Sequence, residues 1–407
     1  MRIFLLLFAL GTFFTNINAQ SEMEKVNSIL KEVKEKFAPD KRTAIFDLEV
    51  NESESKLIIK GETNLPQAKS ELEKTLKEVG LNFTDEIDIL PSKDLGNKIY
   101  GVINLSVANF RSKPDHPAEL VTQAILGTPV KVFNKGEDGY YLVQTPDGYI
   151  SWLDDDGVEF MNEAEMNDWL SSPKIIYLKE YGFSYSVADV KSQTVSDLAA
   201  GNLLKIMGED SDFYLVNYPD GRTAYVKKDE AKLFNDWYNS LNPTGETILK
   251  TAYRFMGIPY LWGGTSTKGM DCSGFTKTVY YLNGIVLQRD ASQQVNTGEL
   301  VETNDGWQNL QAGDLLFFGR KADENRKERI THVAIYIGDG DFIHAAGRVK
   351  INSFNPEKSY YSDYRKSGFI RAKRILTSVG KNGIERILEN VFYNLKTIRW
   401  VISFCFI

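Results

Sequence analysis

The sequence contains an internal repeat that restricts the folds open to the chain. The segments YYLVQTPDGYISWLDDD (140–156) and FYLVNYPDGRTAYVKKD (213–229) align residue for residue. Each copy places short alternating strands around a Pro-Asp-Gly turn, where Gly148 or Gly221 can take a positive φ. Two copies of one such unit predict two small β-barrels of roughly 60–70 residues each, so we expect the chain to fold as several domains.

Length and composition are consistent with several domains and exclude some classes of partner. A length of 407 residues allows two to four domains, and 42% apolar residues are enough to build packed cores. The net charge of −7 argues against nucleic acid or an anionic membrane as a partner.

The N-terminus is typical of a signal peptide. Arg2 precedes the apolar run IFLLLFALGTFF (3–14), and NINA ends at a plausible cleavage site after Ala19. The apolar run is too short to span a bilayer comfortably, and no cysteine near the cleavage site offers a lipid anchor. The sequence predicts an exported protein, located in the periplasm or outside the cell.

The two ends of the mature chain carry less information. Residues 20–95 combine helical and strand patterns that predict a small α/β domain, for which a structural or spacer role is the simplest interpretation. Near the C-terminus, GIERILENVFYNLKTI (383–398) has helical periodicity and WVISFCFI (400–407) is almost wholly apolar. The apolar segment is too short to cross a membrane, which favours a packing tail or an abnormal chain end over a membrane contact.

Residues 240–376 change in character. A helical pattern ending at Gly257 is followed by the Gly-rich loop IPYLWGGTSTKGM, and a second helical pattern begins near Cys272 and stops at Gly284. Three strand patterns follow, GDLLFF, HVAIYIG and DFIHAA. This order predicts an α+β domain in which helices precede an antiparallel sheet.

This region also holds a free thiol and two of the three histidines. Cys405, the other cysteine, lies in the C-terminal tail, so we expect Cys272 to remain unpaired. Its place at the start of a helix favours the thiolate, and a nearby imidazole would lower its pKa further. A lone buried Cys is often core filling, and a strand His is often a hydrogen-bonded core residue. The joint presence of Cys272, His332 and His344 favours nucleophilic catalysis, without a metal because no HExxH or CxxC spacing occurs.

The two histidines can cooperate only if they share one face of their hairpin. A plain two-residue turn at Asp339-Gly340 would place His332 and His344 on opposite faces of the sheet. A three-residue turn with a left-handed Gly340, or an equivalent bulge, brings them to the same face within reach of each other. We expect one of these irregular turns.

Three motifs of this region resemble the NlpC/P60 cysteine peptidases, which are cell-wall hydrolases with a papain-like fold. The motifs are GIPYLWGGTSTKGMDCSGF, LQAGDLLFFG and ITHVAIYIGDGDFIHAA. The resemblance implies Cys272 as nucleophile, His332 as general base, His344 as the third polar residue and Tyr260 as an oxyanion donor. The repeat, in GTPVKVF and GYYLVQTPDGYISWL, resembles bacterial SH3-like domains, which implies binding or positioning.

The expected fold is thus α+β, with a papain-like NlpC/P60 catalytic domain preceded by two SH3-like β-barrels and a small N-terminal α/β domain. The expected boundaries are 1–19 for the signal peptide, 20–95 for the α/β domain, 100–170 and 174–236 for the barrels, 240–376 for the peptidase and 377–407 for the tail.

The whole layout is similar to a narrower group, the γ-D-glutamyl-L-diamino acid endopeptidases, also called dipeptidyl-peptidase VI. In that group the first SH3-like domain closes one end of the groove and selects a free N-terminal L-Ala. The resemblance implies that Asp271 and Glu119 hold the cationic amine. It further implies that Trp262, Tyr149 and Ser273 line the pocket.

The activity implied is hydrolysis of the γ-D-glutamyl–diamino acid bond in freed peptidoglycan stem peptides, by a monomer that needs no cofactor. Diaminopimelate and lysine both stay open as the diamino acid. Two alternatives also stay open: an endopeptidase that cuts intact cross-linked peptidoglycan, and a non-catalytic wall-binding protein.

Overall fold

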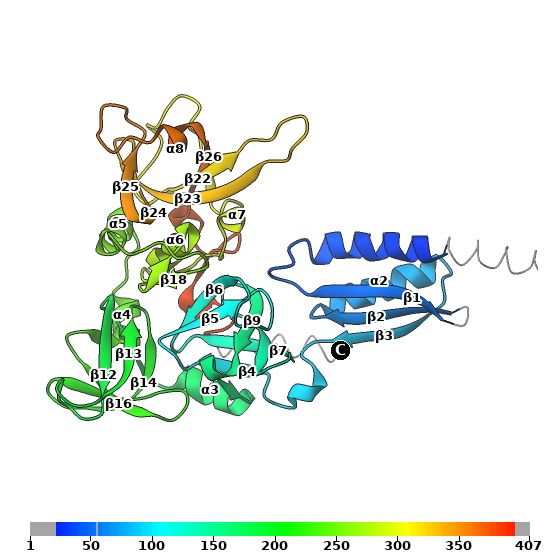
Figure 1. Cartoon of the computed structure of the whole chain (residues 1–407), viewed down its shortest axis with the longest axis horizontal. Coiled ribbons are helices and arrows are strands. Elements are labelled where there is room, and N and C mark those ends of the chain that lie inside the picture. Colours follow the sequence, from blue (N-terminus) through cyan, green and yellow to red (C-terminus); the bar gives the residue numbers. More distant parts are fainter. Residues whose placement is uncertain (1–21, 54–55, 395–407) are drawn as a thin grey trace, which may run out of the picture. The chain divides into compact units, whose positions relative to one another are not determined.

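The computed structural model describes residues 22–53 and 56–394 of the chain (Figure 1). The chain divides into two compact units, residues up to Gly96 together with Phe133–Lys135, and the remainder. The expected signal peptide, Cys405 and the apolar end of the tail lie outside the described residues.

The first unit is a helix-covered three-stranded sheet, as the α/β pattern predicts. A helix over residues 22–37 precedes the sheet, whose middle strand pairs antiparallel with one neighbour and parallel with the other. A helix connects the two parallel strands, which makes a βαβ crossover. The elements after the first helix are β1 (Phe46–Ser53), β2 (Lys56–Thr63), α2 (Pro66–Glu78), β3 (Phe83–Ile89) and the short η1 (Lys93–Leu95).

The second unit opens with two seven-stranded barrels, although the end of one strand, Phe133–Lys135, groups with the first unit. The first barrel contains β4 (Tyr100–Ile103), β5 (Val107–Arg111), β6 (Leu120–Ile125), β7 (Pro129–Lys135), β8 (Tyr140–Gln144), β9 (Ile150–Asp154) and β10 (Val158–Met161), with η2 (Asp155–Gly157) before β10 and α3 (Glu163–Ser171) after it. The second barrel contains β11 (Lys174–Tyr177), β12 (Tyr181–Tyr185), β13 (Thr194–Ala199), β14 (Leu203–Glu209), β15 (Phe213–Asn217), β16 (Thr223–Lys227) and β17 (Ala231–Leu233).

The two barrels share one topology. Neighbouring strands follow the order β10-β4-β7-β8-β9-β5-β6 in the first barrel, and the corresponding strands follow the same order in the second. The repeated Pro-Asp-Gly turns join β8 to β9 and β15 to β16, with Gly148 at φ 82° and Gly221 at φ 87°. The two β-barrels that the repeat predicts are therefore confirmed.

The two turn aspartates have different partners. Asp220 pairs with Arg222 of its own turn at 2.7 Å. Asp147 has a fully buried side chain and pairs at 2.8 Å with Lys277, which lies on the helix that begins at Cys272. The turn of the first barrel is therefore an anchor on that helix, whereas the turn of the second barrel is not.

The C-terminal part combines short helices with a six-stranded antiparallel sheet, in the order β21-β26-β22-β23-β24-β25. Its helices are α4 (Phe234–Asn239), α5 (Gly245–Arg254), α6 (Cys272–Tyr281), α7 (Ala291–Gln294) and α8 (Asp363–Ser367). The sheet strands are β21 (Glu299–Val301), β22 (Leu315–Arg320), β23 (Arg329–Gly338), β24 (Asp341–Ala346), β25 (Arg348–Ser353) and β26 (Phe369–Arg374). Two small hairpin strands, β18 (Thr265–Ser266) and β19 (Gly269–Met270), lead into α6.

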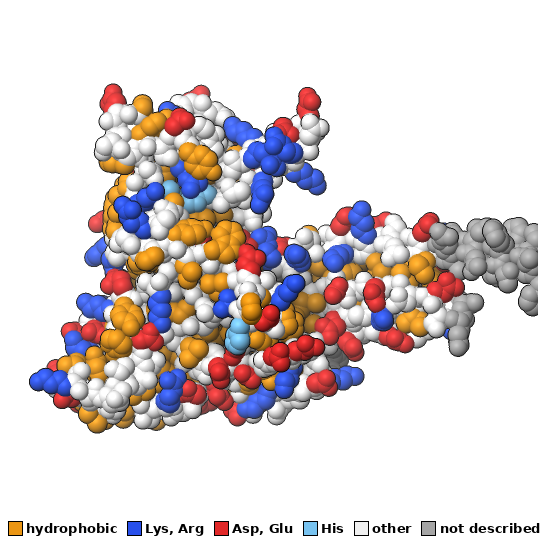
Figure 2. All heavy atoms as spheres, viewed as in Figure 1, with side chains coloured by type: hydrophobic (Ala, Val, Ile, Leu, Met, Phe, Trp, Pro, Cys, Tyr) orange, Lys and Arg blue, Asp and Glu red, His pale blue; other side chains and the backbone are white. Residues whose placement is uncertain are grey.

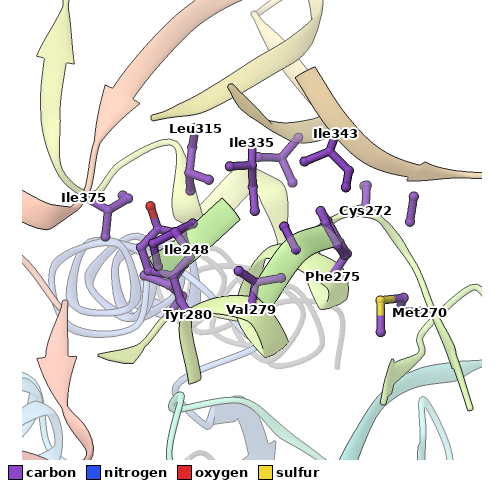
Figure 3. Packing of buried hydrophobic residues seen from close by; sticks show 14 of the residues in the cluster. Ile248, Met270, Cys272, Phe275, Val279, Tyr280, Leu315, Ile335, Ile343 and Ile375 are labelled. Carbon is purple, nitrogen blue, oxygen red and sulfur yellow. The ribbon is translucent and has the colours of Figure 1, made fainter. Parts of the chain in front are cut away.

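One apolar core joins α6 to the sheet. Phe275 and Val279 of α6 pack in the same cluster as Leu315, Ile335 and Ile343 of the sheet, and Figure 3 shows Cys272 at the edge of this cluster. The helix is thereby held against the strands that carry the histidines. The prediction of helices ahead of an antiparallel sheet is confirmed.

The described part of the tail departs from the sequence prediction. In place of an α-helix it forms η3 (Leu376–Ser378), β27 (Glu385–Arg386) and η4 (Ile387–Glu389), and β27 pairs with β20 (Ile285–Val286). Ile384 and Ile387 are fully buried on either side of β27, so their three-residue spacing serves packing rather than a helical stripe. No helix in the described part of the chain is long and apolar enough to cross a membrane.

Candidate active site

The thiol lies at the first residue of α6. Asp271 caps the helix by accepting a hydrogen bond from the Gly274 amide at 2.7 Å. The Cys272 side chain is 8% exposed, and its sulfur accepts hydrogen bonds from the backbone amides of Ser273 and Val333. Since Val333 follows His332 on β23, the sulfur lies against the strand that carries this histidine.

An irregular turn brings the two histidines to one face. Asp339 and Gly340 form a two-residue turn with φ of 51° and 79°, and a bulge at Ile337 shifts the register between β23 and β24. Because Ile335 pairs with Ile343 beyond the bulge, His332 and His344 both fall on the opposite face from this pair. The bulge that the sequence predicts as one of two solutions is confirmed.

A chain of hydrogen bonds fixes the protons of this pair. Asn352 of β25 donates its amide hydrogen to the Tyr360 carbonyl at 2.8 Å, so its Oδ1 is left to accept from Nε2 of His344 at 2.8 Å. His344 must then accept at Nδ1, and Nε2–H of His332 donates to it at 2.7 Å. The remaining nitrogen of His332, Nδ1, therefore carries a free lone pair, as a general base requires.

The thiol is more strongly protonated than its place on the helix suggests. Burial, together with the Asp271 carboxylate, raises the pKa of Cys272 to about 11, although the Val333 amide acts in the opposite direction. Burial and the neighbouring His344 lower the pKa of His332 well below its ordinary value. The expectation of a thiolate lowered by helix and imidazole is wrong for the resting site, because burial of the sulfur outweighs the helix amides. The pair rests as neutral thiol and neutral imidazole.

Tyr260 lies beside the sulfur. It forms an isolated bridge with Met270, two residues before Cys272, and is half-buried. Burial and the nearby Cys272 raise the pKa of Tyr260 to about 12. Its hydroxyl is therefore protonated at neutral pH and able to donate a hydrogen bond.

A buried arginine organises the polar side of the site. Arg289 is 1% exposed and binds both oxygens of Asp271, at 3.1 and 2.5 Å. It also donates to the hydroxyl of Ser273 at 3.0 Å and to that of Thr122, on β6 of the first barrel, at 3.0 Å. Burial acts to lower the pKa of Arg289, but the charge of Asp271 outweighs it and raises this pKa. Arg289 thus joins the cap of the catalytic helix to the first barrel.

A second link joins the loop before α6 to the first barrel. Glu119 accepts a hydrogen bond from the indole nitrogen of Trp262 at 2.7 Å, and Trp262 is otherwise 62% exposed. The backbone at Gly263 approaches the backbone of the first barrel closely, because Gly263, at φ 78°, has no side chain. A Cβ at this position would come within 2.2 Å of the Leu120 carbonyl oxygen.

The structure brings the sequence-predicted residues together in separate contacts: Glu119 with Trp262, Asp271 with Ser273, and His332 with His344. Tyr149 is buried on the first barrel and acts electrostatically on Arg289. Asp271 is placed as predicted, but its carboxylate already binds Arg289, the Gly274 amide and the Gly263 amide at 3.1 Å. Its main task in the described structure is to cap α6.

Two residues of the site were missed by the sequence analysis. Asn352 gave no signal, because its role depends on the register of β24 and β25. Arg289 could have been suspected from its position, since a lone cation follows the apolar run GIVLQ. Its partner Asp271 lies 18 residues away and Thr122 lies 167 residues away, so neither contact could be assigned.

Comparison with known proteins agrees with this geometry. Residues 257–371 match the NlpC/P60 family, and residues 110–158 match the bacterial dipeptidyl-peptidase SH3 domain. The chain is 32% identical over 234 residues to a γ-D-glutamyl-L-lysine dipeptidyl-peptidase of Bacillus cereus, covering 56% of this chain and 67% of that relative. The chain belongs to the NlpC/P60 family.

Other relatives extend the likeness beyond the peptidase part. A dipeptidyl-peptidase 6 of Lysinibacillus sphaericus is 26% identical over 271 residues, which cover 64% of this chain and 93% of that protein. The crystal structure of an NlpC/P60 family protein from Bacillus cereus superposes with a TM-score of 0.57 at 26% identity, covering 68% of this chain and 99% of the other.

The family match, together with relatives named dipeptidyl-peptidases, identifies the chain as a cysteine peptidase. These matches confirm the expected fold class as a mixed α+β chain with an NlpC/P60 domain and an SH3-like domain.

Proposed function

We propose that this NlpC/P60 peptidase hydrolyses the γ-D-glutamyl–diamino acid bond of freed peptidoglycan stem peptides that begin with L-Ala. Relatives named γ-D-glutamyl-L-lysine dipeptidyl-peptidase and dipeptidyl-peptidase 6 support a peptidase of peptidoglycan peptides. The observation that supports the finer proposal is the hydrogen bond between Glu119 and Trp262, because it holds a carboxylate of the first barrel against the loop that leads to Cys272.

That carboxylate suits a free N-terminal amine. Glu119 is exposed, and the described structure records its side-chain hydrogen bond through Oε1, which leaves Oε2 directed at solvent or ligand. A cationic amine held there by a charge-assisted hydrogen bond would lie two residues from the bond to be cut. Stem peptides still attached to glycan have this nitrogen acylated, so they lack the charge that Glu119 recognises.

The first chemical step is acylation of the thiol. Nδ1 of His332 takes the proton of Cys272 as the sulfur attacks the γ-carbonyl carbon of D-Glu. The negative charge that develops on the carbonyl oxygen meets the hydroxyl of Tyr260 and the amide of Cys272 at the open end of α6. The C–N bond then breaks, and the proton on His332 passes to the leaving amine of the diamino acid.

The second step returns the enzyme to its resting state. His332 takes a proton from water, whose oxygen attacks the thioester carbon. The C–S bond breaks, the sulfur regains a proton from His332, and L-Ala-D-Glu leaves. Both half-reactions need His332 as a neutral base at the start, which its lowered pKa provides across the neutral range.

The proposal places this activity outside the cytoplasm, in the periplasm or beyond, because residues 1–19 have the pattern of a signal peptide. It also places the enzyme after the reactions that release stem peptides from glycan.

A comparison of two peptides tests the proposal. We expect L-Ala-γ-D-Glu-L-Lys to be cleaved to L-Ala-D-Glu with a kcat/KM roughly 10–100-fold above that of its N-acetylated form, the value of one charge-assisted contact. Glu119→Gln keeps the acceptor for Trp262 but removes the charge, so this variant should lose most of the preference. Glu137→Gln, an exposed residue of the same barrel, should keep it. Equal cleavage of both peptides, or faster release of fragments from whole sacculi, would contradict the proposal.

A further inference from the structure

A cationic side chain that the proposed mechanism does not use lies next to the histidine pair. The guanidinium carbon of Arg365, on α8, lies 5.7 Å from the ring centroid of Phe318 and 5.2 Å from that of Tyr364. Phe318 is the cross-strand partner of His332, and their ring centroids are 5.8 Å apart. Arg365 is therefore one ring away from the general base.

A second cation lies on the other side of the pair. Lys350 of β25 is the direct cross-strand partner of His344, so both side chains stand on the same face of the sheet. The charges of Arg365 and Lys350 both act on His332 and on His344. Figure 2 shows Lys and Arg side chains beside the histidine atoms that are visible in the upper part of the view. We call Arg365 and Lys350 the cationic pair.

The cationic pair has no anion of its own. Within residues 22–53 and 56–394, neither side chain forms an ion pair with a carboxylate. Arg365 is half-buried over two aromatic rings, and burial lowers its pKa. The other buried cations close to the sulfur and its helix are matched, since Arg289 binds Asp271 and Lys277 binds Asp147. A half-buried guanidinium without a counter-charge beside a catalytic pair is suited to a ligand anion.

The cationic pair lies on the histidine side of the site, and this position indicates which part of the substrate it would contact. The Glu119 side of the site, with Trp262, would receive the N-terminal amine of the peptide. The leaving amine must depart towards His332, because this residue protonates it. Groups around and beyond the histidines therefore face the diamino acid, and a diamino acid at the end of a peptide carries a free α-carboxylate.

We infer that Arg365, assisted by Lys350, binds the α-carboxylate of the leaving diamino acid and makes the enzyme selective for stem peptides that end at this residue. The inference rests on the proposed function and deepens it, since it defines the C-terminal limit of the substrate. A peptide whose diamino acid is extended or cross-linked through its α-carboxyl group lacks this charge.

The test compares L-Ala-γ-D-Glu-L-Lys with its C-terminal amide, both with a free N-terminus. The parent enzyme should favour the carboxylate over the amide by roughly 10–100-fold in kcat/KM. Arg365→Met should remove most of this preference by slowing cleavage of the carboxylate alone. Lys350→Met should reduce it less. Lys366→Met, which removes the exposed neighbouring cation on α8, should leave the preference unchanged.

The outcomes separate the inference from the function beneath it. A parent enzyme that cleaves carboxylate and amide equally overturns the inference and leaves the proposed function standing. Arg365→Met that slows both peptides by the same factor also overturns it, because a purely structural role would do this. No cleavage of either peptide overturns the proposed function and the inference together.

Discussion

Replacement of Cys272 by alanine lowers kcat on L-Ala-γ-D-Glu-L-Lys by about 10⁴-fold or more, because the described residues offer no second thiol to form the acyl intermediate. His332→Gln produces a loss of similar size, since the thiol rests protonated and cannot attack until a base takes its proton. The double variant should be no worse than either single variant, because the two residues act as one unit. Product release measured by mass spectrometry checks all three.

The second cysteine is the matched control. Cys405→Ala should retain the parent turnover, and near-native thermal unfolding of Cys272→Ala would show that its loss is chemical. Turnover by Cys272→Ala within tenfold of the parent would contradict the assignment of the nucleophile.

Arg289→Met is expected to lower the free energy of unfolding by about 3–5 kcal/mol, the usual cost of leaving one partner of a buried ion pair uncompensated. The arginine is 1% exposed and binds Asp271 in a bidentate geometry, so no water replaces it without a rearrangement of the helix cap. Activity should fall as well, because Asp271 positions the first turn of α6, where the thiol lies. Chemical denaturation gives the stability change, and kcat on the tripeptide gives the effect on activity.

Two further variants show whether the buried charge is the cause. Addition of Asp271→Asn to Arg289→Met removes the unpaired carboxylate while keeping an oxygen for the cap, so it should recover part of the stability. Arg371→Met breaks an exposed pair with Glu328 and should cost no more than about 1 kcal/mol. A loss for Arg289→Met as small as that for Arg371→Met would contradict the role given to Arg289.

Local patterns predicted the elements well where one face is buried and turn residues are explicit. The Pro-Asp-Gly repeat fixed the hairpins of both barrels because alternation and a positive-φ glycine are visible in the sequence. The requirement that His332 and His344 share one face followed from the alternation of side chains along their two strands. The sequence does not predict which irregularity occurs, because a three-residue turn and a bulge both bring the two histidines to the same face. The bulge at Ile337 is the solution in the structure.

The failures have a common physical origin in long-range packing. The start of α6 is visible in the sequence, but the burial of its first side chain is not, so the direction of the pKa shift of Cys272 was wrong. Asn352 acts only because β25 lies beside β24, and Arg289 only because the first barrel covers α6. The spacing of Ile384 and Ile387 is typical of a helix, but both side chains are buried on either side of the short strand β27. Such roles require the tertiary neighbours.

The central claim is that Cys272 rests as a thiol and that His332 ionises it only during attack. Alkylation of Cys272 by iodoacetamide, followed by mass spectrometry in a Cys405→Ala background, tests this most directly. Iodoacetamide reacts with the thiolate, and a raised pKa means that Cys272 ionises only at high pH. The alkylation rate should therefore keep rising beyond pH 9, with the midpoint of its pH profile at about 11. A rate that reaches its plateau below pH 7 would show a preformed thiolate–imidazolium pair and contradict the account.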